Sequence, residues 1–326
     1  MTDSPSGPKA EIWDYLRIMR LDHMTKHIFI LPGIALALLL RERPLDGILW
    51  VLIIGFASAV FIASANYVIN EWLDREFDAL HPEKSERAAV QKEMCGQVVL
   101  ALYAGLLVLG IALSWTVNTV FFVTTILFAI AGVLYNVKPI RLKDWPYLDV
   151  LSESLNNPIR LVLGWSMIDP FSLPPLSLLL GYWLGGAFLM NSKRLAEYRS
   201  IVAQAGHDIL HRYRRSFSHY DEPRLLVANL VYALGCAFFL AIFLIKYKIE
   251  YLLIFPLLTA LFAEYFRVAL LVDSIARKPE RLFRARRLMV YSVATAVAFF
   301  VLTFVELEWL DDFADPHFVE LAKPEG

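Results

Sequence analysis

Hydrophobic residues fill nine stretches of this chain, and shorter polar segments separate them. A membrane-spanning helix needs about 20 mostly apolar residues, and most of the nine stretches approach that length. The pattern therefore predicts an all-α, polytopic membrane bundle of about nine transmembrane helices. The predicted spans cover residues 25–40, 47–70, 97–115, 119–137, 148–168, 173–190, 225–245, 251–272 and 288–305.

Lysine and arginine residues are distributed unevenly among the segments between these spans. With the N-terminus placed in the cytoplasm, 24 of the 31 lie on the cytoplasmic side and 5 lie outside. Because these residues concentrate in cytoplasmic loops, the alternation predicts a cytoplasmic N-terminus and an outside C-terminus. Long polar loops tend to carry function, so we expect the active site to face the cytoplasm. The predicted single membrane domain, 1–326, has a cytoplasmic arm (1–24), two long cytoplasmic loops (71–96 and 191–224) and an acidic tail (306–326).

The composition agrees with a membrane protein and excludes several other classes. Of the 326 residues, 58% are hydrophobic and 19% are charged, whereas soluble domains carry about 25% charged residues. A disordered chain is excluded, and the two cysteines, Cys95 and Cys236, cannot build a disulfide scaffold. The net charge of −1 gives no reason to expect a nucleic acid as partner. Membrane lipids are expected partners, with their headgroups beside the basic run at residues 211–215.

A polar face with a four-residue repeat lies at the cytoplasmic end of the second predicted span. Asn66, Asn70, Asp74 and Asp78 share this spacing, which places them on one side of a helix. Stacked carboxylates repel one another unless a cation bridges them, and Mg²⁺ takes one or two carboxylates together with substrate phosphates. We predict that Asn70, Asp74 and Asp78 bind Mg²⁺, with both aspartates catalytic and Asn66 contacting substrate. The alternative is a solvated helix end, because charges of both signs are interleaved there.

Basic residues accompany this face in three places. Lys84 and Arg87 follow it directly, Lys193 and Arg194 follow the sixth span, and Lys26 lies at the start of the first. Cations beside an acidic helix end suit a ligand whose phosphates the metal also holds. We therefore predict that these five residues bind substrate. The alternative is that the positive-inside distribution alone places them there.

A second polar set leads from the fourth loop into the fifth span. Asp149 and Glu153 repeat the four-residue spacing, and Arg160 follows within an otherwise apolar stretch. Ionisable residues at membrane depth call for partners. One interpretation pairs Glu153 with Arg160 or Asn156 as a structural contact. The other makes this face the second wall of a diphosphate clamp, in which Asp149 is catalytic. The substrate contacts of that wall would be Arg141, Lys143, Glu153 and Arg160.

These motifs resemble those of the UbiA superfamily of membrane transferases. The run Asn70-x-x-x-Asp74-x-x-x-Asp78 is similar to the first aspartate-rich motif of that superfamily. The segment Tyr135-Asn-Val-Lys-Pro-Ile-Arg-Leu-Lys143, followed by Asp149, resembles its second characteristic region. The resemblance covers nearly the whole chain. It implies a Mg²⁺-dependent enzyme that uses a diphosphate donor and an acceptor at the membrane surface.

Three further segments resemble the decaprenyl-phosphate phosphoribosyltransferase branch of the superfamily. They begin at Arg20, Asp78 and Lys193. This resemblance implies transfer of 5-phosphoribose from phosphoribosyl diphosphate to a polyprenyl phosphate, at the cytoplasmic face of a bacterial inner membrane. The alternative is a UbiA-type transfer of an isoprenoid from its diphosphate to an aromatic or other polar acceptor. Asp149 and Glu153 favour that alternative, because they are closer to a prenyltransferase second motif.

A transporter or channel is the competing class of protein. Asp149, Glu153 and Arg160 would then relay ions within the membrane. The polar residues cluster at one face of the membrane, however, and no inverted repeat with broken helices is evident. We therefore favour an enzyme with an isoprenoid lipid as one substrate, and we expect His81 to be structural rather than catalytic. A homo-oligomer remains compatible with the sequence.

Overall fold

The computed structural model describes residues 8–81, 83–271, 274 and 285–310. These residues form helices and their connections, with one isolated bridge between Lys9 and Glu93. Within them, seven helical segments are long and apolar enough to cross a membrane. The predicted all-α membrane bundle is thereby confirmed, while the count of nine spans and the orientation of the termini remain predictions. Residues 275–284 and 311–326, which hold part of the predicted eighth loop and most of the acidic tail, lie outside the described residues.

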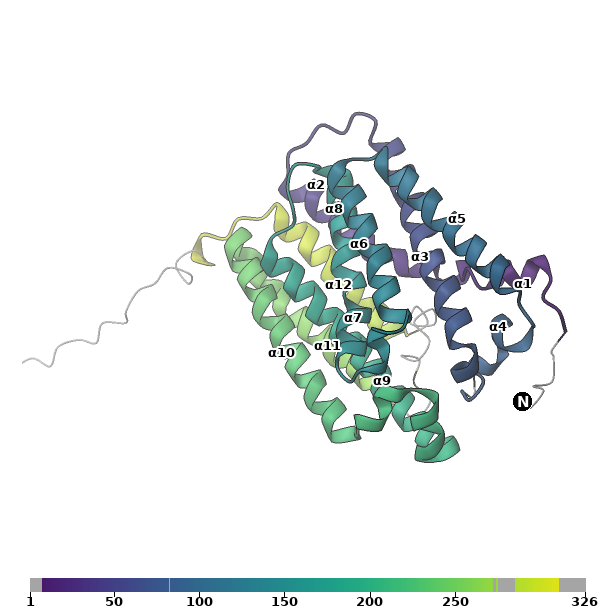
Figure 1. Cartoon of the computed structure of the whole chain (residues 1–326). Helices are drawn as coiled ribbons and strands as arrows, with labels where there is room; N and C mark the ends of the chain where they lie inside the picture. Colours follow the sequence, from purple (N-terminus) through teal and green to yellow (C-terminus); the bar gives the residue numbers. More distant parts are fainter. Residues whose placement is uncertain (1–7, 82, 272–273, 275–284, 311–326) are drawn as a thin grey trace, which may run out of the picture.

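The long helices pack side by side in a bundle (Figure 1). They are α2 (Leu31–Leu40), α3 (Ile48–Asp78), α5 (Gly96–Trp115), α6 (Thr119–Asn136), α8 (Asn156–Ile168), α9 (Leu176–Tyr213), α10 (Glu222–Tyr247), α11 (Phe255–Ala269) and α12 (Arg286–Thr303). Shorter α-helices are α1 (Ile12–Arg17), α4 (Ala88–Gln91) and α7 (Leu148–Ser154). The 3₁₀ segments are η1 (Leu21–Ile30), η2 (Lys84–Glu86), η3 (Leu142–Asp144), η4 (Arg215–His219) and η5 (Ile249–Ile254).

Two of the predicted segments differ from the observed helices. The predicted span 148–168 is divided into α7 and α8, and Pro158 supplies the reason. Proline has no N–H, so the carbonyl of Ser154 has no helical partner and the helix is interrupted there. The predicted loop 191–224 is helical as far as Tyr213, because α9 continues through it with a change of direction at Gly206. The basic residues after the sixth predicted span therefore stand on a helix.

The helices that surround the centre of the bundle approach one another closely. Ile62 of α3 and Leu163 of α8 are fully buried beside Phe128 of α6. A Cβ atom added to Gly164 would lie 2.1 Å from the carbonyl oxygen of Ile30. Small residues permit such close helix contacts in membranes, and Gly164 permits one here.

The outer faces of the bundle carry large apolar side chains. Trp50 on α3, Val108 on α5, Phe238 on α10 and Val293 on α12 are all more than 60% exposed. Apolar surface of this extent is unfavourable in water and is expected where a protein faces lipid. Together with the seven candidate spans, it identifies an integral membrane protein.

Candidate active site

A cavity of about 1150 Å³ lies between the helices of the bundle. At its polar end, charged and amide side chains come from α3, η3, α7 and α9; at its apolar end, residues such as Leu36, Leu178, Phe243 and Phe299 form the wall. Thirteen of the fourteen predicted site residues line it. They are Lys26, Asn66, Asn70, Asp74, Asp78, Lys84, Arg87, Arg141, Lys143, Glu153, Arg160, Lys193 and Arg194.

The four-residue repeat on α3 forms one wall of the cavity, as its spacing predicts. Asn70 donates a hydrogen bond from Nδ2 to Oδ2 of Asp74 at 3.3 Å and another to Oδ1 of Asn136 at 2.5 Å. Oδ2 of Asp78 forms an ion pair with Nη1 of Arg87 at 2.5 Å. The two carboxylates and the amide therefore lie on a single face of α3, and cations lie beside both carboxylates.

The cations opposite Asp74 come from the short segment η3. Nη2 of Arg141 lies 2.8 Å and Nζ of Lys143 lies 2.6 Å from Oδ1 of Asp74. Arg141 holds a left-handed backbone with φ of 35°, a conformation that is costly for a residue with a side chain. Burial lowers the pKa of Lys143 to about 8, and the contact with Asp74 partly offsets this. Backbone strain at Arg141 and burial of Lys143 therefore accompany the placement of two cations beside one carboxylate.

The connection after α3 contacts the C-terminal half of α9. Nζ of Lys84 lies 3.3 Å from Oε1 of Glu197 and also contacts the hydroxyl of Tyr213. Nδ1 of His81 accepts hydrogen bonds from the backbone N–H groups of Glu83 and Lys84 at 3.1 and 3.3 Å. Burial lowers the pKa of His81 to about 4, so the ring is neutral near pH 7. These contacts agree with the structural role expected for His81.

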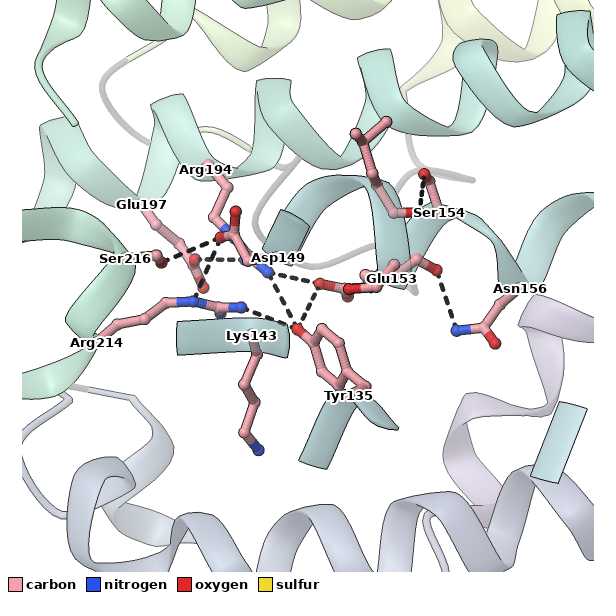
Figure 2. Close-up of polar contacts among 12 residues, drawn as sticks. Tyr135, Lys143, Asp149, Glu153, Ser154, Asn156, Arg194, Glu197, Arg214 and Ser216 are labelled. Carbon is pink, nitrogen blue, oxygen red and sulfur yellow. Dashed lines mark hydrogen bonds and ion pairs between the residues drawn. The ribbon is translucent and has the colours of Figure 1, made fainter. Parts of the chain in front are cut away.

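Three carboxylates surround the guanidinium of Arg194 on α9 (Figure 2). Nε lies 3.2 Å from Asp149, Nη2 lies 2.5 Å from Glu153, and Nη1 lies 2.9 Å from Glu197. Arg194 is 1% exposed. Glu153 thus pairs with Arg194 rather than with Arg160, and the side chain of Asn156 donates to the backbone oxygen of Glu153, not to its carboxylate.

Asp149 lies behind the wall of the cavity, and its catalytic role stays a prediction. It is 0% exposed and is the one predicted site residue absent from the described lining. Its Oδ1 accepts a hydrogen bond from the hydroxyl of Tyr220 at 2.7 Å. Its Oδ2 accepts hydrogen bonds from the hydroxyl of Ser216 at 3.1 Å and from Nε of Arg194 at 3.2 Å. Both oxygens of Asp149 are therefore engaged by protein groups, and Asp149 supports Arg194.

Sequence reasoning overlooked two contributors to this region. Nη2 of Arg214 donates to the hydroxyl of Tyr135 at 2.9 Å, and that hydroxyl donates to Glu153 at 3.0 Å. We expected Arg214 to contact lipid headgroups, yet it lines the cavity. The path of the chain after α9 brings Arg214 to the cavity, and the spacing of residues in the sequence does not predict that path. Tyr135 begins the motif that ends at Lys143, so the resemblance of that motif could have identified Tyr135 as a site residue.

Lys26 and Arg160 contribute cations from two other elements. Nζ of Lys26, on η1, lies 5.2 Å from the centre of the Tyr67 ring. The guanidinium of Arg160, on α8, lies 5.0 Å from the centre of the Phe128 ring, and Nη1 is 3.4 Å from the carbonyl oxygen of Asn156. Both residues line the cavity, so positive charge reaches from its polar end towards its apolar end.

The fold is similar to solved UbiA structures. A UbiA homologue from Archaeoglobus fulgidus, solved with DMAPP and Mg²⁺, superposes with a TM-score of 0.65 at 19% identity, over 90% of this chain and 100% of that one. The same homologue solved with GPP and Mg²⁺ gives a TM-score of 0.64 at 19% identity, over the same shares of the two chains. At these identities the likeness establishes the fold alone.

Two curated relatives are similar over part of their length. A digeranylgeranylglyceryl phosphate synthase from Archaeoglobus fulgidus is 25% identical over 107 residues, which is 33% of this chain and 34% of the relative. A 4-hydroxybenzoate octaprenyltransferase from Providencia stuartii is 27% identical over 179 residues, which is 54% of this chain and 57% of the relative. The matched regions thus span about a third and just over half of these relatives.

The family comparison extends over most of the chain. Residues 28–293 match the UbiA prenyltransferase family, a range that includes both motif segments and most of the residues that line the cavity. The all-helical fold and the position of the matched motifs at one cavity agree with this match. The chain therefore belongs to the UbiA prenyltransferase family.

Proposed function

We propose that this protein transfers 5-phosphoribose from phosphoribosyl diphosphate to a polyprenyl phosphate, at the cytoplasmic face of a bacterial inner membrane. The observation that carries the proposal is the charge of the cavity. Among the described residues, eleven lysine and arginine side chains line it, against five carboxylates. When the buried Asp149 and Glu197 are also counted, the cations still exceed the carboxylates, eleven against seven.

This excess suits two heavily phosphorylated substrates. Phosphoribosyl diphosphate carries a diphosphate and a 5-phosphate, and the lipid acceptor carries a further phosphate. A single prenyl diphosphate with bound Mg²⁺ needs far fewer compensating cations. Arginine and lysine bind phosphate through charge-assisted hydrogen bonds, which are stronger than neutral ones. The apolar end of the cavity suits the isoprenoid chain of the acceptor.

The α3 face fits a Mg²⁺ ion. Within the described residues there is no cluster of three or more histidine, cysteine or acidic side chains that suits a metal. Mg²⁺, however, takes one or two carboxylates and completes its shell with water and substrate phosphates. Asp74 and Asp78, with the amide oxygen of Asn70, would hold it on the cavity wall. The ion would supply positive charge to the diphosphate.

The protein residues would bind, orient and stabilise the reacting groups. Lys84, Arg87 and Lys193 line the polar end and would hold the phosphates of the donor. The bond between ribose C1 and the diphosphate oxygen breaks, the diphosphate leaves with the electron pair, and an oxygen of the acceptor phosphate forms the new bond to C1. Preorganised cations stabilise the charge that develops on the leaving group. The acceptor phosphate is already ionised, so no general base is required.

Prenyl transfer is the second candidate function. Its support is specific: the curated relatives are named as a prenyltransferase and a digeranylgeranylglyceryl phosphate synthase, and a homologue was solved with DMAPP and GPP. In that reaction the diphosphate at the polar end would belong to the isoprenoid. The apolar end would hold the donor chain rather than the acceptor chain.

A direct product assay separates the two functions. The purified protein is incubated in detergent micelles with Mg²⁺, labelled phosphoribosyl diphosphate and polyprenyl phosphates of several lengths. Parallel incubations contain prenyl diphosphates with 4-hydroxybenzoate or a glycerophosphate lipid as acceptor. The proposal predicts ribose label in the lipid fraction and no prenylated acceptor. Prenylation of an acceptor without any ribose label in lipid would establish the second function instead.

A further inference from the structure

Arg160 differs from the other buried arginines of the described chain. Arg141 and Arg194 are also buried, and carboxylates hold both of them at 2.5–3.2 Å. Among the residues that the structure describes, no carboxylate lies within ion-pair distance of Arg160, which is 6% exposed. Its Nε is buried without a hydrogen-bond partner. Its contacts are the Phe128 ring and the carbonyl oxygen of Asn156.

A guanidinium in this environment calls for an anion. Arginine does not lose its proton in proteins, so the charge cannot be relieved by neutralisation. A buried charge is costly unless a partner and hydrogen bonds compensate it, and at membrane depth such residues mark binding sites. The cavity is the surface of Arg160 that is open to a ligand. A ligand anion in the cavity would supply the missing partner of Nε.

Arg160 belongs to a layer that lies deeper than the metal-binding face. Nδ2 of Asn66 donates to the backbone oxygen of Phe128 at 3.1 Å, and Arg160 lies over the ring of the same residue. Asn66 precedes Asp74 by eight residues on one helix, a rise of about 12 Å along α3. A Cβ on Gly132 would lie 1.9 Å from Oδ1 of Asn66, so the absence of a side chain there leaves room for this amide. The layer of Asn66 and Arg160 is therefore separate from the level of Asp74.

We propose that Arg160 binds the phosphate group of the polyprenyl phosphate acceptor. This inference rests on the proposed function, in which the donor phosphates occupy the polar end and the isoprenoid chain occupies the apolar end. The lipid phosphate then lies where these two regions meet, and Arg160 is the buried cation at that depth. From there the phosphate faces the ribose of the donor. Arg160 thereby distinguishes a lipid phosphate from the corresponding uncharged alcohol.

The test measures lipid binding separately from ribose transfer. Labelled polyprenyl phosphate is bound to the purified protein in micelles, and unlabelled polyprenyl phosphate or polyprenol competes with it. The wild type is expected to prefer the phosphate by about tenfold or more, and Arg160→Met to reduce the preference to about twofold. Arg160→Lys keeps the charge and should retain part of the preference, and it serves as the test if Arg160→Met does not fold.

Two further variants control the measurement. Arg267→Met removes an exposed arginine of α11 that pairs with Glu264 and does not line the cavity, so the phosphate preference should persist. The double variant Lys84→Met, Arg87→Met should weaken binding of phosphoribosyl diphosphate and leave the lipid preference intact. Retention of the full preference in Arg160→Met, or equal binding of phosphate and alcohol by the wild type, overturns the inference. An Arg160-dependent preference without any ribose transfer supports the inference and refutes the proposed function.

Discussion

Two acidic faces of the molecule share one spacing and differ in their partners. Asp74 and Asp78 on α3 line the cavity, and their cations come from η3 and from the connection after α3. Asp149 and Glu153 on α7 share Arg194 of the long helix α9, and Nε of Arg214 also lies 3.6 Å from Asp149. The spacing predicts which side chains share a helical face. The element that supplies the cation determines whether the face remains available to a ligand.

This difference separates a binding face from a structural junction. The two α3 carboxylates meet cations on the cavity surface, where phosphates and a metal ion can take their places. Arg194 also lines the cavity, but it is 1% exposed and contacts three carboxylates from α7 and α9. Breaking a buried ion pair leaves an uncompensated charge, so such groups exchange partners with difficulty. We therefore interpret the α3 face as catalytic and the Arg194 cluster as the junction that holds α7 against α9.

Arg194→Met tests the junction and should have the largest effect on stability. It removes the cation that Asp149, Glu153 and Glu197 share, and loss of one partner of a buried pair costs about 3–5 kcal/mol. We expect a strongly lowered melting temperature or loss of the folded protein, measured by thermal unfolding in detergent. Arg224→Met is the control, because Arg224 is exposed and pairs only locally with Asp221. An unchanged melting temperature for Arg194→Met would show that the cluster does not hold the fold together.

Asp74→Asn tests the binding face and should affect activity rather than folding. The amide cannot supply the anionic oxygen that Mg²⁺ requires, and we expect turnover to fall by about 100-fold, equivalent to about 2.7 kcal/mol of transition-state stabilisation. The melting temperature should fall less than in Arg194→Met, because Arg141 keeps Asp144 as an ion-pair partner. Glu76→Gln is the matched control, two residues away on α3 with an 81% exposed side chain, and should keep full turnover. If Asp74→Asn retains wild-type turnover, the metal assignment is wrong.

Mg²⁺ titration compares one carboxylate from each face directly. Asp78→Asn removes a proposed ligand, so the Mg²⁺ concentration for half-maximal activity should rise by about tenfold, equivalent to about 1.4 kcal/mol. Glu153→Gln removes a partner of Arg194 and should leave that concentration unchanged while it lowers the melting temperature. Equal shifts in the Mg²⁺ requirement for both variants would remove the distinction between the two faces and indicate a metal at each.

The helical spans and the α3 face could be predicted because both depend on local periodicity. Asn66, Asn70, Asp74 and Asp78 share a face in any regular helix, whatever the rest of the chain does. Pro158 was also a readable signal for the interruption between α7 and α8, because proline lacks the N–H that a continuous helix needs. Local rules therefore predicted most of the spans and one wall of the cavity, whereas the break at Pro158 and the extension of α9 were not predicted.

The partners of the second face could not be predicted, because they depend on distant segments. Nearness in sequence suggested Arg160 for Glu153, whereas the observed partner, Arg194, comes from α9. Arg214 reaches Tyr135 only because η4 follows α9 and turns back towards α7. Spacing within one helix carries no information about which other helix packs against it. The burial of Asp149 follows from the same packing between distant segments, so it could not be predicted from the sequence either.

Tyr135→Phe is the mildest test of the comparison. The variant keeps the ring and removes a hydroxyl that donates to Glu153 and accepts from Arg214, and a hydrogen bond to a charged group contributes about 1.5–3 kcal/mol. Arg194 remains bound to Glu153, so we expect a lowered melting temperature but a smaller loss than in Arg194→Met. The Mg²⁺ requirement should stay at the wild-type value, because the hydroxyl contacts the junction and not the α3 face. A raised Mg²⁺ requirement with an unchanged melting temperature would instead place Tyr135 with the metal-binding residues.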